Sequence, residues 1–187
     1  MNKRAFDIAL VLLLAAPTTL IALIIAIAVR ATSPGPALYW SRRIGENGRE
    51  FLMPKFRSMK IETPEKATHL LTNPSQWLTP IGSILRKFSL DELPQLFSVA
   101  RGDMSLVGPR PVLFNEADLI AARQRCGVDV LRPGITGWAQ VNGRDVLSIL
   151  QKVEFDRQYL LRRSFVLDLK IICLTALQVL LRKGVSH

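Results

Sequence analysis

Cysteine, histidine and aromatic residues are scarce in this chain of 187 residues, of which 7% are aromatic. The two cysteines, Cys126 and Cys173, lie far apart, and no Cys-x-x-Cys pair occurs. Neither cysteine has a histidine at ligand spacing, and the histidines themselves, His69 and His187, are isolated from each other. A disulfide framework and a zinc site are therefore not supported, and a reducing compartment is favoured.

The usual nucleotide-binding signatures are also missing. The sequence contains no Walker loop, no Gly-x-Gly-x-x-Gly and no Asp-x-Asp, which argues against the common nucleotide-binding folds. Acidic residues are in deficit, because 25 Lys and Arg against 15 Asp and Glu give a formal net charge of +10 at pH 7. Such an excess indicates an anionic partner, and charge alone leaves nucleic acid, a membrane surface and a phosphorylated substrate open.

Apolar surface, in contrast, is abundant. Hydrophobic residues make up 49% of the chain, enough for the core of one domain, which argues against intrinsic disorder. The excess is concentrated in residues 8–29, a run of 22 residues without one charge. As a helix this run would be about 33 Å long, which matches the hydrocarbon core of a bilayer.

Three interpretations of this apolar run compete. A cleaved signal peptide is disfavoured because the run is too long, Asp7 stands where positive charge is expected, and Pro17 lies in its middle. A Pro-kinked helix that spans the bilayer stays open. Basic residues on both sides, such as Lys3 and Arg30, give both flanks the mark of the cytoplasmic face. We therefore expect residues 1–30 to form a re-entrant membrane helix, broken at Pro17, that returns to the face it entered.

A β-hairpin is predicted directly after this membrane element and a turn-rich linker over residues 31–36. Asn47-Gly48 is the strongest short-range hairpin signal, and it lies between two segments, 37–43 and 49–57, that we expect to be the strands. The hairpin carries four cationic side chains, Arg42, Arg43, Lys55 and Arg57. Residues 60–80, which are polar and contain three prolines, predict a long loop of the kind that often covers a site.

The rest of residues 31–187, which we expect to be one cytoplasmic catalytic domain, is predicted to be mainly α-helical. Residues 126–144 are punctuated by glycine and proline, and Asp145 can cap the helix that follows them. The predicted helices cover residues 81–88, 94–100, 115–125, 145–161 and about 164–183.

The last of these helices has polar residues at helical spacing on an otherwise apolar sequence. Charges interrupt it too often for a span of the bilayer, so we expect an amphipathic helix that lies in the membrane interface with its polar stripe in water. An ordinary core helix is the alternative. The residues of the polar stripe are Asp168, Thr175, Gln178 and Arg182.

Two adjacent carboxylates, Asp91 and Glu92, are the leading candidates for chemistry. They could be helix punctuation, because Ser89 and Glu92 have the spacing of a capping box. Pro94 argues against this, since it would remove a hydrogen bond at the fifth helical position. A helix that begins later leaves both carboxylates near its mouth. Close to Arg86, a carboxylate there would stay ionised and could bind a divalent metal or attack a phosphorus centre.

Two further motifs are candidates for phosphate binding. In residues 102–111, Arg110 stands between two prolines, and a guanidinium on so restricted a backbone suits bidentate contact with phosphate. A salt bridge that stabilises a turn is an equal alternative. In residues 132–144 the glycines permit tight turns and close backbone approach, and the polar groups could hold a phosphate or a base.

Together these motifs make the chain resemble the bacterial sugar transferase family, the small monotopic phosphoglycosyl transferases that act on polyprenyl phosphate. The resemblance covers nearly the whole chain, and the ordered set of motifs is highly specific. It departs from the family pattern where Ala16 precedes Pro17, a position where members often have Ser, and where Ile44 follows Arg43, a position where members often have Pro. The motifs that carry it are the proline-containing N-terminal helix and residues 55–59, 89–96, 102–111, 132–144 and 164–171.

The resemblance implies a two-step transfer. Asp91 would attack the sugar-linked phosphate of a UDP-sugar, expel UMP and form an aspartyl phosphosugar, which polyprenyl phosphate would then take up. The product would be a polyprenyl diphosphate sugar, the lipid-linked first unit of a surface glycan. The resemblance also implies Mg²⁺ at Asp91 and Glu92. The phosphate- or substrate-binding positions that it implies are Arg86, Arg110, Lys55, Arg57, Arg132, Gln140 and Arg144.

The implied location is the bacterial inner membrane, where the partners are the UDP-sugar, polyprenyl phosphate and membrane lipid, with the catalytic part in the cytoplasm. A competing class is a non-catalytic, membrane-attached basic protein that binds nucleic acid or anionic lipid, but the scattered aromatic residues argue against nucleic acid. A transferase that moves a sugar without its phosphate would release UDP instead of UMP. The sugar depends on pocket shape, which local motifs do not encode, and a homo-oligomer stays open.

Overall fold

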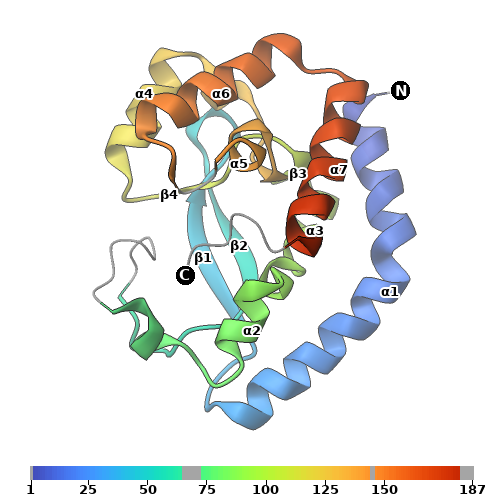
Figure 1. Ribbon diagram of the computed structural model, residues 1–187, viewed down its shortest axis with the longest axis vertical. Coiled ribbons are helices and arrows are strands. Elements are labelled where there is room, and N and C mark those ends of the chain that lie inside the picture. The colour runs from blue at the N-terminus through green and yellow to red at the C-terminus, as the bar shows by residue number, and fades with distance from the viewer. Residues whose placement is uncertain (1, 65–72, 144–145, 182–187) are drawn as a thin grey trace.

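The computed structural model describes residues 2–64, 73–143 and 146–181. One long helix, α1, curves along the side of a body formed by the other elements (Figure 1). The body is mainly helical with two small sheets, so the predicted class is confirmed. In chain order the elements are α1 (Lys3–Thr32), β1 (Leu38–Ile44), η1 (Glu46–Gly48), β2 (Glu50–Phe56), η3 (Pro74–Trp77), α2 (Gly82–Lys87), η4 (Leu90–Glu92), α3 (Gln95–Arg101), β3 (Ser105–Val107), β4 (Val112–Leu113), α4 (Ala117–Arg125), η5 (Val128–Val130), β5 (Gly134–Thr136), α5 (Trp138–Val141), α6 (Ile149–Arg162) and α7 (Phe165–Leu180).

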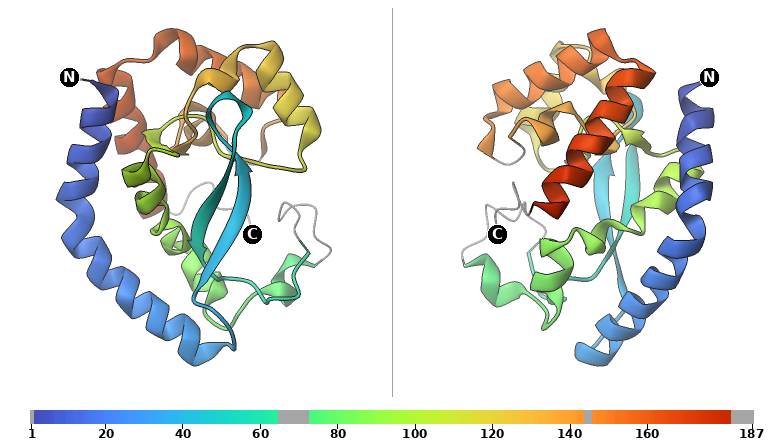
Figure 2. Two further views of the ribbon diagram at one scale, coloured as in Figure 1. Left: turned by 180° about the vertical axis from the view of Figure 1, so that it is seen from behind. Right: turned by 45° about the vertical axis from the view of Figure 1, so that its right-hand side comes forward.

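Helix α1 runs through Pro17 without a break. It changes direction about midway, as Figures 1 and 2 show, and near the bend the hydroxyl of Thr18 donates to the carbonyl of Leu14 at 2.6 Å. A hydroxyl bond to the carbonyl four residues earlier often bends a helix, and Pro17 beside it removes one backbone donor. The predicted break at Pro17 is therefore a bend inside one continuous helix.

Both ends of α1 are attached to the same body. At its start, Lys3 forms an ion pair with Asp168 of α7 at 3.0 Å. At its end, Val29 is fully buried in an apolar cluster with Phe56 of β2 and Leu85 of α2. Between these contacts only 11% of the most apolar 18-residue stretch is buried, which differs from the core helix of a soluble protein. Helix α1 is long and apolar enough to cross a membrane.

The predicted hairpin is confirmed by the antiparallel pair of β1 and β2, to which β4 adds on the far side of β1. Asn47 at the turn adopts a left-handed conformation, with φ 55°, as the Asn-Gly signal requires. A second, parallel pair joins β3 to β5, which the sequence interpretation missed. The expected close backbone approach lies here, because a Cβ on Gly134 would lie 2.1 Å from the backbone nitrogen of Gly108.

Four of the five predicted helices agree with α2, α3, α4 and α7. The remaining one, α6, begins later than predicted, because Ser148 caps it in a reciprocal capping box with Gln151. The expected cap, Asp145, lies outside the described residues. In the described part of residues 60–80, the expected loop contains the short helix η3.

The polar stripe of α7 faces the body of the protein, so the prediction that it lies in water is wrong. Asp168 is 2% exposed, the hydroxyls of Thr175 and Thr136 lie 2.6 Å apart, and Gln178 donates to the carbonyl of Val141 at 2.9 Å. Arg182 lies outside the described residues. The outward face is apolar, which suits a membrane interface, and its exposed residues are Phe165, Val166, Leu169, Leu177 and Leu181.

Candidate active site

The Asp91–Glu92 dyad lies in a short 3-10 turn, η4, directly before α3. Ser89 adopts a left-handed conformation, with φ 53°, and within the described chain its side chain makes no capping hydrogen bond. Helix α3 begins at Gln95, after Pro94. The capping-box interpretation is therefore wrong, and the prediction of a later helix start that leaves the dyad at its mouth is confirmed.

Cationic side chains from β2, α2 and the loop between β3 and β4 converge on the dyad. Lys55 of β2 forms an ion pair with Glu92, with 2.8 Å between Nζ and Oε1, and both side chains are largely buried. One guanidinium nitrogen of Arg110 lies 3.9 Å from the same oxygen, and the Arg110 side chain is 36% exposed. Arg86 at the end of α2 is close enough to act on the charge of Asp91. The structure thus brings together Lys55, Arg86 and Arg110, which the sequence proposed as phosphate-binding residues.

Asp91 is nearly enclosed, since it is 8% exposed. Burial raises the pKa of its carboxyl above the ordinary value, and the negative charge of Glu92 adds to this, whereas Lys55 and Arg86 lower the pKa. The sequence interpretation considered Arg86 but not burial, which has the larger effect. A poorly hydrated carboxylate with a perturbed pKa beside cations is typical of a nucleophile in an active site.

Arg43 is a site residue that the sequence interpretation missed. Its guanidinium donates to the carbonyl of Pro111 at 3.1 Å. Burial lowers the pKa of Arg43 to about 10, and the nearby positive charge of Arg110 contributes. The two-residue period of a strand could have indicated Arg43. Tyr39 pairs with Lys55 across the hairpin, and Arg43 lies four positions after Tyr39, so it lies on the same face of the sheet.

Two other predicted phosphate-binding residues are engaged elsewhere. Arg57 is 6% exposed and donates to the carbonyls of Pro36 at 2.8 Å and Ser33 at 2.9 Å. Arg132 forms an ion pair with Glu46 at 2.9 Å, at the turn of the hairpin, whereas Lys55 lies near its open end. Arg57 holds the linker after α1, and Arg132 joins the β3–β5 region to the hairpin turn.

Gln140, another predicted substrate-binding residue, has a buried side-chain amide. Among the described residues, neither its nitrogen nor its oxygen has a hydrogen-bond partner. Its oxygen would lie 2.7 Å from a Cβ placed on Gly137, so the amide lies directly against this glycine. A buried amide without a partner calls for a water or ligand group. Arg144 lies outside the described residues.

The dyad has the donor set that Mg²⁺ uses when it binds together with a substrate. Within residues 2–64, 73–143 and 146–181, no group of three or more His, Cys, Asp or Glu side chains could hold a metal. Mg²⁺ does not require such a cage, because it is usually bound by one or two carboxylates, several waters and the phosphates of the substrate. Asp91 and Glu92 fit this mode of binding. Two carboxylates do not fit a resident metal that is held by the protein alone.

The chain matches known proteins over nearly its whole length. The profile described as bacterial sugar transferase matches residues 1–182. The chain is 43% identical over 185 residues to the uncharacterized sugar transferase EpsL of Bacillus subtilis (strain 168), with 99% of this chain and 90% of the relative covered. It is 40% identical over 205 residues to the exopolysaccharide production protein ExoY of Rhizobium meliloti (strain 1021), with coverages of 98% and 88%.

Longer relatives have substrates in their names. The chain is 39% identical over 189 residues to the UDP-glucose:undecaprenyl-phosphate glucose-1-phosphate transferase of Escherichia coli (strain K12). This match covers 97% of the chain but 41% of the relative, so the chain spans less than half the length of that protein.

Proposed function

Because the chain belongs to the bacterial sugar transferase family, we propose that it transfers a phosphosugar from a UDP-sugar to undecaprenyl phosphate. The names of the longer relatives support this choice of donor and acceptor. The observation that carries the proposal is the enclosed Asp91 carboxylate, which lies beside Glu92, Lys55 and Arg86. The products are UMP and an undecaprenyl diphosphate sugar, the starting unit of a surface glycan.

In the first step, a carboxylate oxygen of Asp91 attacks the phosphorus that carries the sugar. A bond forms between this oxygen and phosphorus, the bond from phosphorus to the bridging oxygen breaks, and UMP leaves with that oxygen. Negative charge that approaches another negative charge needs positive groups close by. Arg110, which is partly exposed and lies 3.9 Å from Glu92, and Lys55 are the groups that bind and orient the phosphates.

In the second step, a phosphate oxygen of undecaprenyl phosphate attacks the same phosphorus. The bond between phosphorus and Asp91 breaks, and the carboxylate is regenerated. The two steps exchange one phosphoanhydride for another, so no water or redox partner is consumed. The burial of Asp91 supports this chemistry, because an enclosed site keeps water from hydrolysing the acyl phosphate.

Asp91 and Glu92 would hold Mg²⁺ in this site together with the phosphates of the substrate. When bound, the metal neutralises phosphate charge. Lys55 keeps Glu92 in place through their 2.8 Å ion pair, which orients one of the two candidate ligands before any substrate arrives.

The test is a reaction of the purified protein with undecaprenyl phosphate, Mg²⁺ and a panel of UDP-sugars. We expect release of UMP, and a lipid product whose mass includes the sugar and one added phosphate. Release of UDP would mean that the sugar moves without its phosphate. Release of neither nucleotide from any donor would favour the competing class, a non-catalytic basic protein.

We further propose that α1 enters the inner membrane from the cytoplasmic face and returns to it, with the catalytic body in the cytoplasm. The contacts of both helix ends with one body support this, because a body on one side of the bilayer cannot hold the two ends of a spanning helix. The surface of the helix supports its entry into lipid, because six of its large apolar side chains are each at least 59% exposed. They are Leu12, Leu13, Leu20, Leu23, Ile24 and Ile27.

Thiol labelling distinguishes this topology from a spanning helix. In a background with the exposed Cys126 and Cys173 replaced by serine, Asn2→Cys should resist a membrane-impermeant thiol reagent in intact cells and react after lysis. Glu154→Cys is the matched control, since this exposed position on α6 is cytoplasmic in both topologies. Labelling of Asn2→Cys but not Glu154→Cys in intact cells would contradict re-entry. Pro17→Leu should increase labelling at position 2, because a straight helix of this length can span.

A further inference from the structure

The backbone around Arg110 is held from several sides. The carbonyl of Arg110 accepts a hydrogen bond from Arg123 of α4 at 2.8 Å, and the carbonyl of Pro111 accepts one from Arg43 at 3.1 Å. The carbonyl of Pro109 is bound by a backbone amide of β5 at 2.8 Å. Three consecutive carbonyls are therefore engaged. The two prolines restrict their own φ angles, whereas these bonds determine where the segment lies.

The guanidinium of Arg123 is itself held in one orientation. Its Nε and one terminal nitrogen donate to the same carboxylate oxygen of Asp156 in α6, at 3.0 Å and 2.7 Å. Asp156 is 1% exposed and the Arg123 side chain is 11% exposed. A planar guanidinium that makes two bonds to a buried carboxylate has its remaining nitrogen aimed in a fixed direction, and that nitrogen binds the carbonyl of Arg110.

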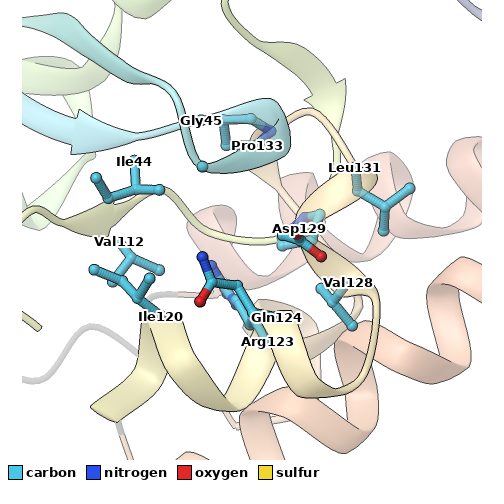
Figure 3. Close-up of a pocket in the computed structure, with 12 residues that line it drawn as sticks. Ile44, Gly45, Val112, Ile120, Arg123, Gln124, Val128, Asp129, Leu131 and Pro133 are labelled. Atoms are coloured by element: carbon cyan, nitrogen blue, oxygen red, sulfur yellow. The ribbon is translucent and has the colours of Figure 1, made fainter. Parts of the chain in front are cut away.

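Arg123 also lines a small pocket with Ile44, Pro109 and Val128. Figure 3 shows this pocket between the hairpin turn and α4, where Ile44, Arg123 and Val128 are labelled. The volume of this pocket is about 30 Å³, which is room for about one water molecule. A sugar or a nucleotide does not fit there. The cavity next to Arg123 thus offers no substrate subsite. Arg123 is linked to the dyad through its bond to the carbonyl of Arg110.

We propose that the buried Arg123–Asp156 pair is a positioning device for Arg110, with Arg43 as a second support on the Pro111 side. The pair would set the place from which the partly exposed Arg110 guanidinium reaches Glu92 and a substrate phosphate. This inference rests on the proposed function, because it assigns Arg110 to a phosphate. Positioning has large effects in such sites, since a displacement of about 1 Å can cost about a hundredfold in rate.

Arg123→Lys tests the proposal, because an ammonium keeps the charge but lacks the planar fork that binds Asp156 and the carbonyl of Arg110 through separate nitrogens. We expect kcat/KM for UMP release to fall about tenfold. In an Arg110→Ala background the same substitution should have no further effect, because the group through which Arg123 acts is gone. Asp156→Asn should behave in the same way. The matched control is Arg157→Lys, in the exposed pair with Glu154 on α6, which should leave kcat/KM unchanged.

The proposal would be overturned if Arg123→Lys lowered kcat/KM by the same factor in the native protein and in the Arg110→Ala background. Thermal unfolding identifies a variant that fails to fold, and in that case Asp156→Asn and Arg43→Lys carry the same comparison. UMP affinity, measured by titration, separates this inference from the proposed function. A protein that binds UMP but turns over no UDP-sugar contradicts the proposed function. In that case the UMP affinities of the native protein, the two single variants and the double variant still show whether Arg123 acts through Arg110. A protein that does neither overturns both.

Discussion

The start of α1 and the start of α3 each bring one lysine together with acidic side chains. Near the start of α1, Lys3 lies between two carboxylates, 3.2 Å from Asp7 and 3.0 Å from Asp168. Before α3, Lys55 lies 2.8 Å from Glu92. Both clusters bring a lysine to carboxylates, but the surroundings of those carboxylates differ.

The carboxylates of the α1 cluster are satisfied from several directions. Ser105 donates to Asp7 at 2.8 Å, and Tyr159 donates to Asp168 at 2.7 Å. Burial raises the pKa of Tyr159, and its bond to Asp168 raises it further, so this hydroxyl stays a donor. A buried polar network in which each member has a partner joins elements rigidly. This cluster ties α1 to β3, α6 and α7.

The dyad cluster is arranged less favourably for folding. Burial raises the pKa of Asp91, which means that its ionised form costs free energy in the folded protein. Arg110 remains partly exposed beside it. Asp7 and Asp168 are thus used up by partners that join elements of the fold, whereas Asp91 lies beside partly exposed cations and is available for chemistry.

The largest expected effect is that of Asp91→Asn, which should lower UMP release at least about a thousandfold. The amide is nearly isosteric but is a poor nucleophile. Because the folded pKa of Asp91 is raised, its charge destabilises the protein above that pKa, and Asn should stabilise the folded protein at pH 7. This gain should vanish below pH ~4, where the carboxyl is protonated in both states.

Mass spectrometry checks the same prediction directly. A phosphosugar adduct should be found at Asp91 in the native protein and be absent from the variant, while Asp103→Asn, in an ion pair with the exposed Arg101, should retain the adduct and the activity. Near-normal turnover by Asp91→Asn would rule out covalent catalysis.

Chelation should separate the two clusters. EDTA is expected to reduce UMP release to background, because the metal neutralises charge on the substrate phosphates. The thermal unfolding midpoint should not change, because a metal that binds together with the substrate does not stabilise the fold. Addition of excess Mg²⁺ should restore the rate. Full activity in EDTA would remove the metal from the proposal.

Lys55→Met should lower kcat/KM about a hundredfold at pH 7. The charge of Lys55 lowers the pKa of Asp91, so its loss raises that pKa and reduces the ionised fraction. The acid limb of the pH profile should therefore move to higher pH, and the loss should be smaller at pH 9 than at pH 6. Lys3→Met is the control, with an unchanged profile and lower stability. Coincident profiles for Lys55→Met and the native protein would argue against this role of Lys55.

Asp7→Asn should affect the fold and not the chemistry. It leaves a buried amide opposite Lys3 and Ser105, which costs about 1–3 kcal/mol of stability. We expect the lower end of this range, because the Lys3 side chain is 40% exposed and water screens the pair. Urea unfolding measures the loss, and kcat of the folded protein should not change. An unchanged unfolding midpoint would mean that this network does not hold α1 in place.

Much of the fold follows from interactions between residues that are close in the sequence. Asn47-Gly48 predicted the hairpin because only a few residue types adopt its left-handed turn. Ser89 and Pro94 together predicted the late start of α3, because proline cannot continue a helix from an earlier cap. The site residues Lys55, Arg86 and Arg110 are a different case, because the family resemblance implied their place near phosphate, and the structure brings them to the dyad.

Contacts between distant segments could not be predicted in this way. The parallel pair of β3 and β5 joins Ser105 to Gly134, and nothing in either short segment specifies the other. Arg57 and Arg43 have the same charge on the same hairpin, yet Arg57 binds the linker and Arg43 faces the site. Which carbonyl a guanidinium meets depends on the packing of elements around it.

Local sequence alone specified the long apolar helix, the hairpin, the dyad at the mouth of a helix, and which residues share one face of α7. Only the packing of the elements shows that Asp168 and Gln178 face inward. The same holds for the continuous course of α1 through Pro17 and for the bond from Arg123 to the carbonyl of Arg110. The physical reason is that periodicity groups side chains on a face without saying whether that face meets protein or its surroundings. Next to a membrane, apolar side chains can face outward, so the direction is set only when the elements pack.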